Sequence, residues 1–121
     1  MIKEAYCSFE VSKLLKEKGF NEPCCGRYSI RSKEFHLDCT KMCNNGGLFE
    51  CAAPTHQMAM AYLREKGVYM SIDSIISSSR NVYYSIDVYT EESGWENVVD
   101  LYTSYEEAVE AALKYSLENL L

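Results

Sequence analysis

Two segments in the second half of the chain alternate strictly between apolar and polar side chains. Over residues 68–73 and 82–89, one face receives mainly aliphatic side chains and the other receives tyrosine, serine and aspartate. A period of two is that of a half-buried β-strand. The short polar connection SSSRN at 77–81 therefore predicts an antiparallel hairpin. We predict a third strand at 95–102, which completes a sheet with one apolar face for helices to cover.

Three other segments have the apolar spacing of amphipathic helices. They are expected over 8–18, over 53–67 and from Ser104 onward. The last helix is the most strongly specified, because Ser104 and Glu107 form a capping box and a long apolar stripe follows them. The sequence thus predicts three helices with one apolar face each.

Residues 21–51 have the weakest pattern and are rich in cysteine. RYSI at 27–30 and EFHL at 34–37 are short enough to be the strands of a small hairpin, and NNGG at 44–47 is a strong turn signal. The segment is predicted to be either an irregular insertion or such a hairpin.

Together these elements predict the α+β class. We expect a single two-layer domain over residues 1–121, with an antiparallel sheet of three to five strands and about three helices on one face, in the order α-ββ-α-βββ-α. A chain of 121 residues is long enough to bury one core.

The chain is acidic, with a formal net charge of -6 and scattered basic residues. Proteins that bind nucleic acid neutralise phosphates with clustered Lys and Arg, so a nucleic-acid partner is not expected. No uncharged apolar stretch is long enough for a signal peptide or a membrane span. The expected location is the cytoplasm, where the six cysteines should be thiols or metal ligands rather than disulfides.

A zinc site is the first chemical hypothesis for the cysteines. Cys39 and Cys43 have an acceptable ligand spacing, and Cys24, Cys25 or His36 could complete a tetrahedral set. Against this, the other half of the set is not a spaced pair, because adjacent cysteines seldom direct both sulfurs at one ion. The alternative is that these thiols are small buried apolar groups or loop residues. We commit to no metal or other cofactor, and keep zinc on Cys24, Cys39, Cys43 and His36 as an alternative.

A cysteine nucleophile is the second chemical hypothesis. Cys51 precedes the second predicted helix, whose N-terminus would lower its pKa, and His56 follows as a base. No third orienting group is recognisable in the sequence. We therefore assign no catalytic residue and expect a protein that is not an enzyme.

Tyrosines occupy the polar face of the predicted sheet and suggest a binding surface. Tyr69, Tyr83 and Tyr89 alternate with acidic residues there, which would repel phosphate. These tyrosines are better suited to cross-strand pairs, a homodimer or another protein partner.

Four blocks in order along the chain carry a resemblance to a known group. FEVSKLLKEKGF followed by EPC, APTHQMAMAYLRE, VYYSIDVY and SYEEAVEAALKYSLENL together resemble small hypothetical proteins of gut Bacteroidales and their phages or other mobile elements. The resemblance covers most of the chain apart from residues 26–50. It implies association with such an element, and it implies no reaction, cofactor or site residue.

The leading hypothesis is a small, cytoplasmic, non-enzymatic accessory protein that acts through protein contacts. The alternative is a zinc-binding module built on the segment from Cys24 to Cys51. A weaker alternative is an acidic inhibitor that occupies the basic groove of a host nucleic-acid-binding protein.

Overall fold

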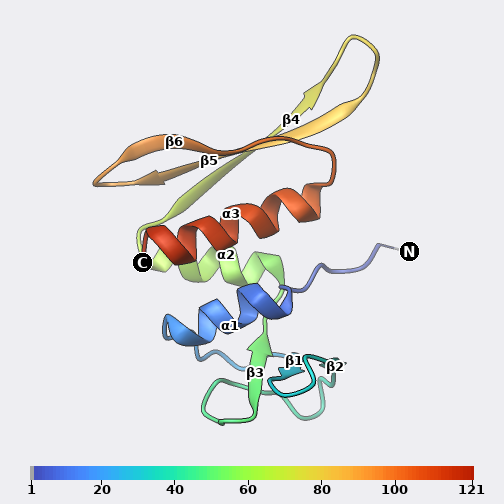
Figure 1. Ribbon diagram of the computed structural model, residues 1–121, viewed down its shortest axis with the longest axis vertical. Helices are drawn as coiled ribbons and strands as arrows, with labels where there is room; N and C mark the ends of the chain where they lie inside the picture. The colour runs from blue at the N-terminus through green and yellow to red at the C-terminus, as the bar shows by residue number, and fades with distance from the viewer. Residues whose placement is uncertain (1) are drawn as a thin grey trace. The chain divides into compact units, whose positions relative to one another are not determined.

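The computed structural model describes residues 2–121 and confirms the α+β class. It contains three helices and two antiparallel sheets of three strands each (Figure 1). In chain order the elements are α1 (Phe9–Glu17), β1 (Gly26–Ser29), β2 (Phe35–Leu37), β3 (Glu50–Ala53), α2 (His56–Glu65), β4 (Tyr69–Ile76), β5 (Val82–Thr90), β6 (Gly94–Tyr102) and α3 (Tyr105–Asn119). The predicted order is confirmed except that β3 was not expected.

The chain divides into two compact units, residues 1–59 and 60–121, and the boundary falls within α2. Each unit contains one of the two sheets. The single domain expected over 1–121 stays a prediction. None of the helices in residues 2–121 is long and apolar enough to span a membrane.

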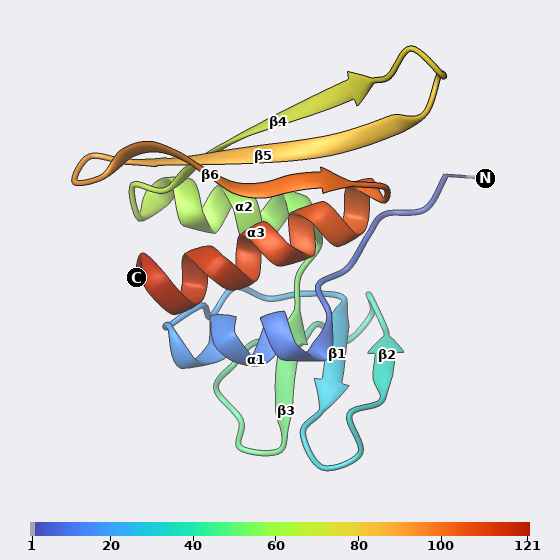
Figure 2. The ribbon, with the colours of Figure 1, turned by 45° about the horizontal axis from the view of Figure 1, so that its top comes forward.

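The first unit is built on a sheet in the order β2-β1-β3, with both pairings antiparallel (Figure 2). The hairpin predicted from RYSI and EFHL is β1 and β2, so the irregular alternative for this part is wrong. Ser8 caps α1 by accepting a hydrogen bond from the Val11 amide at 3.2 Å. The helix packs against β3, and the core of the unit is formed by Cys7, Val11, Leu15, Phe20, Cys24, Cys51, Ala52 and Ala53.

Lys16 at the end of α1 holds the chain that leads into β3. Its Nζ donates to the carbonyl oxygens of Gly47 and Glu50, the latter at 2.8 Å. This loop would otherwise expose unpaired carbonyls beside the helix. The lysine therefore ties the turn predicted at NNGG to α1.

The second unit is built on a sheet in the order β4-β5-β6, with α3 lying along one face of β5 and β6 (Figure 1). Ser104 caps α3 by accepting from the Glu107 amide at 3.3 Å, as the sequence predicts. The Tyr115 hydroxyl donates to Glu96 Oε1 at 2.8 Å, which joins the polar side of α3 to β6. The buried Leu, Ile and Val side chains of this unit are Leu63, Val68, Ile86, Val88, Val99, Val109, Leu113 and Leu117.

Candidate interaction surface

The face of the second sheet that points away from α3 carries a row of three aromatic side chains. The register places Tyr69 opposite Tyr89 and Tyr89 opposite Trp95, so all three lie on one face. Their ring centroids are 6.3 Å apart for the tyrosine pair and 5.3 Å apart for Tyr89 and Trp95. Trp95 is 58% exposed and Tyr69 45% exposed. We call Tyr69, Tyr89 and Trp95 the aromatic row.

The aromatic row lies on the opposite face from the core because the strands alternate. Ile86 and Val88 of β5 are fully buried on the α3 side, and the residues between and beside them point outward. Sequence reasoning identified Tyr69 and Tyr89 but missed Trp95. The signal for Trp95 was present, since a tight turn at 91–93 places it directly opposite Tyr89.

Tyr83, the third tyrosine predicted for this surface, lies apart from the aromatic row. It pairs with Ile75 near the tip of the β4–β5 hairpin, six positions from Tyr89 along β5. At the rise of an extended strand this separation is roughly 20 Å. Tyr83 is half-buried, and Ile75 is 39% exposed. The predicted tyrosine surface is therefore two separate patches on one face.

Polar residues lie between these two patches and are organised by Asn97. The Asn97 amide nitrogen donates to Asp87 Oδ1 at 2.9 Å, to Ser85 Oγ at 3.0 Å and to the Val99 carbonyl at 3.1 Å. The β5–β6 register shifts at this point, and the amide ties the two irregular strands together. It also holds the Asp87 carboxylate beside the aromatic row.

The charge of this sheet is entirely acidic. β4, β5 and β6 contain Asp73, Asp87, Glu96 and Asp100 and no Lys, Arg or His. Asp73 and Asp87 belong to the outward face by alternation. An exposed aromatic row next to carboxylates attracts cationic groups and repels phosphate.

The cysteine-rich segment has a different arrangement from the predicted zinc set. Cys25 and Cys39 are joined by a disulfide with a Cα–Cα distance of 4.4 Å, so not all six cysteines are thiols, contrary to the expectation for a reducing compartment. The β1–β2 pairing explains this, because it brings the chain before Gly26 next to the chain after Leu37.

The other members of the predicted zinc set lie in separate places. Cys24 and Cys43 exchange two backbone hydrogen bonds of 2.8 Å, and the Cys24 sulfur lies 3.7 Å from that of Met58. His36 is on β2 with an exposed side chain 3.9 Å from Glu34. Within residues 2–121, the ligand atoms of Cys24, Cys39, Cys43 and His36 do not form a set lying within 4.8 Å of one another. The zinc hypothesis stays a prediction.

Three thiols of this unit, those of Cys24, Cys43 and Cys51, have raised pKa values. Burial, together with the nearby Cys43, raises the pKa of Cys24 to about 11. Burial also raises the pKa of Cys43 and of Cys51. The nucleophile is the thiolate, so raised pKa values mean less reactive sulfur at neutral pH.

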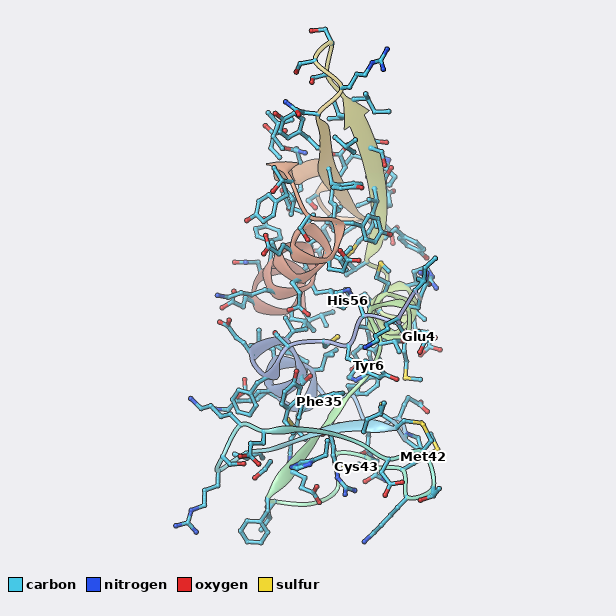
Figure 3. All side chains as sticks on the ribbon, turned by 90° about the vertical axis from the view of Figure 1, so that its right-hand side faces the viewer. Glu4, Tyr6, Phe35, Met42, Cys43 and His56 are labelled. Carbon is cyan, nitrogen blue, oxygen red and sulfur yellow. A yellow bond between two sulfur atoms is a disulfide. The ribbon has the colours of Figure 1, made fainter. Side chains whose placement is uncertain are left out.

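Cys51 and His56, the nucleophile and base of the second chemical hypothesis, do not have the arrangement that the sequence suggested. Cys51 is fully buried within β3, opposite Tyr28, and not at the N-terminus of α2. A helix dipole therefore does not lower its pKa. The sulfur near His56 is that of Cys7, within 4.8 Å of a ring nitrogen (Figure 3 labels His56). Both side chains are buried, at 0% and 5% exposure.

Aromatic side chains pack on the face of the first sheet that α1 covers, where Tyr28 contacts the Phe9 ring of α1. Tyr6 and Phe35 lie side by side with ring centroids 5.4 Å apart (Figure 3), and Phe35 also contacts Tyr28 at 5.3 Å. The Tyr28 hydroxyl donates to the Cys7 carbonyl at 2.8 Å. These contacts join β2 to β1 and to the chain before α1, while the β2 side chains themselves stay exposed.

Thiol titration tests this assignment of the cysteines. Unfolded protein that has not been reduced is expected to react at four thiols, those of Cys7, Cys24, Cys43 and Cys51, and at six after reduction. In the native protein at pH 8, Cys43 should react first, because it is half-exposed and the other three are buried.

Six reactive thiols before reduction would contradict the disulfide. The persistence of a disulfide would in turn conflict with a cytoplasmic location, where thiols are kept reduced. Elemental analysis of reduced protein is the matched measurement. Stoichiometric zinc would favour the metal-binding alternative.

Comparison with protein-family models, with curated proteins and with solved structures found no match. The resemblance to small proteins of gut Bacteroidales and their mobile elements therefore stays a prediction.

Proposed function

We propose that the chain is a small non-enzymatic accessory protein whose outward sheet face binds a Lys- or Arg-bearing segment of a protein partner. One observation carries this proposal: the aromatic row, with Tyr69 and Trp95 exposed, stands next to the Asp87 carboxylate on a sheet whose strands contain no basic residue. Tyr, Trp and Arg are the residues most enriched at the hot spots of protein interfaces, and Arg is the cation most often found over an aromatic ring.

The chemistry of the face favours a cationic partner. A guanidinium or ammonium group over Trp95 or Tyr69 would gain a cation–π interaction. Asp87 is two residues before Tyr89 on the same face of β5, so its carboxylate lies beside that position. The net charge of -6 would steer such a partner toward the protein over longer distances. Inhibition of a basic nucleic-acid-binding protein is a narrower form of the same proposal.

The cellular setting is proposed from the sequence. We propose a cytoplasmic protein of a phage or mobile element of gut Bacteroidales. In that setting a small acidic protein would act on host or element proteins.

Trp95 is the only tryptophan in the chain, so its fluorescence reports on the face directly. A short peptide of alternating arginine and leucine is expected to shift the Trp95 emission saturably. A peptide with glutamate in place of arginine should cause no shift. Binding should weaken as salt is raised, because screening removes the charge attraction.

Calorimetry with variants locates the binding surface. Tyr69→Ala is expected to weaken binding of the arginine peptide by about tenfold to thirtyfold, as truncation of an aromatic anchor costs about 2 kcal/mol. Tyr105→Ala is the matched control, because Tyr105 is similarly exposed at 38% but lies on α3. Equal binding of both peptides, or equal loss in both variants, would refute the proposal.

A further inference from the structure

The second sheet has two edges, and they differ in how well they are protected. In residues 2–121 the edges are β4 and β6, since the strand order is β4-β5-β6. β6 has two register shifts against β5 and a left-handed residue, Leu101, with φ of 54°. Bulges of this kind twist an edge and prevent another strand from pairing with it.

β4 has none of these protections. All eight of its residues pair with β5 in one unbroken register. Its sequence YMSIDSII contains no proline and no lysine, and Asp73 is its only charged residue. Ile76 at its end is 69% exposed. A long, regular and mostly apolar edge is a template for another strand.

The hairpin turn determines which backbone groups of β4 face outward. The Ser77 amide donates to the Asn81 carbonyl at 2.9 Å, so residue 77 is bonded toward β5. In an antiparallel pair, the backbone groups of every second residue point toward the partner strand. The amides and carbonyls of residues 75, 73, 71 and 69 therefore also point toward β5. The amide and carbonyl groups that face the open edge therefore belong to Met70, Ile72, Ser74 and Ile76.

We propose that this edge pairs antiparallel with β4 of a second copy of the chain, about a two-fold axis at Ile72. In an antiparallel pair, residues opposite each other lie on the same face of the sheet. A two-fold axis between the strands therefore places one residue opposite its own copy. Centred on Asp73, the pairing would place two carboxylates opposite each other. Centred on Ile72, it places Ser71 opposite Asp73 and Tyr69 opposite Ile75.

The strand is therefore complementary to itself. Each position finds a suitable partner across the axis: a hydroxyl meets a carboxylate, an aromatic ring meets a β-branched side chain, and Ile72 meets Ile72. The outward amide of Ser74 in each copy faces the outward carbonyl of Met70 in the other copy. Eight-residue strands bury less surface than a stable interface of about 800 Å² per partner, so the dimer is expected to depend on concentration.

This inference does not rest on the proposed function, because the backbone edge of β4 carries it; Tyr69 is the one residue of the aromatic row that takes part in the pairing. The two respond to salt in opposite directions. Two copies of net charge -6 repel each other, so the dimer should tighten as salt is raised. Binding of a cationic peptide to the face should weaken.

Sedimentation velocity over a concentration series tests the edge. The native chain is expected to double its mass as concentration rises, and Ser74→Pro is expected to stay monomeric. Ser74 is exposed, and its amide faces the open edge, so proline removes an interchain donor without breaking the β4–β5 ladder. Ser78→Pro is the matched control, because residue 78 is in the hairpin turn and accepts proline, and it should dimerise like the native chain.

A gain-of-function variant keeps the test decisive if Ser74→Pro folds poorly. Ser71→Lys places a lysine opposite Asp73 of the other copy at two symmetric positions, and should tighten the dimer by about twofold to thirtyfold. A native chain that stays monomeric at every concentration would overturn the inference. So would a dimer that Ser74→Pro leaves intact and Trp95→Ala abolishes, since Trp95 lies on β6 and that result would assign the contact to the aromatic face.

Discussion

Replacement of Leu113 by alanine is expected to lower the free energy of unfolding by about 2–5 kcal/mol, the usual cost of truncating a buried leucine. Leu113 is fully buried in the middle of α3, whose apolar stripe packs on β5 and β6. Alanine removes apolar surface and leaves a cavity that the surrounding helix and strands cannot fill completely. The same change should loosen the sheet that presents the aromatic row.

Urea unfolding followed by circular dichroism and by Trp95 fluorescence measures this effect. Glu118→Ala is the matched control on the same helix, because Glu118 is exposed. Its free energy of unfolding should change by less than about 0.5 kcal/mol. A Leu113 variant as stable as the Glu118 variant would contradict the proposed packing of α3 on the sheet.

Replacement of Gly26 by alanine is expected to destabilise the first unit by about 1–3 kcal/mol, the usual cost of inserting an atom into a packed interior. Gly26 lies in the central strand of its sheet, opposite Leu37 on one side and Ala53 on the other. A Cβ there would lie 2.7 Å from the Ala53 carbonyl oxygen and 3.0 Å from the Phe35 ring. The backbone oxygen cannot move without shifting β3, so the added methyl group forces the strands apart.

Gly47→Ala is the matched control for this substitution. A Cβ at Gly47 meets no atom within 4 Å, so alanine should change stability little. Both variants are compared by urea unfolding monitored by circular dichroism. Equal stability of the two would show that the close approach at Gly26 is relieved at no cost.

The aromatic face and the β4 edge would act together if both proposals hold. Pairing about Ile72 joins the two sheets edge to edge. The aromatic rows of the two copies then lie on the same face of the joined sheet. A dimer with two equivalent faces binds a partner carrying two cationic segments more tightly than one face does, through effective concentration. The salt dependence separates the two contributions.

Local patterns were sufficient for most of the elements. The helices were predictable because caps and 3.6-residue periodicity act within a few residues, as Ser8 and Ser104 do. β4 and β5 were predictable because alternation is a local property of a half-buried strand. β3 was missed because ECAA has no alternation, since three of its four residues are buried. Its position depends on pairing with β1, which is distant in sequence.

The candidate surface shows the same division. The sequence by itself determined that one sheet face carries tyrosine and acid without any basic residue, because alternation assigns each side chain to a face. Only the tertiary structure decided that Trp95 joins Tyr69 and Tyr89, that Tyr83 lies apart, and that Cys25 bonds to Cys39. Those outcomes depend on strand register, and register is determined by turns and pairings between residues that are far apart along the chain.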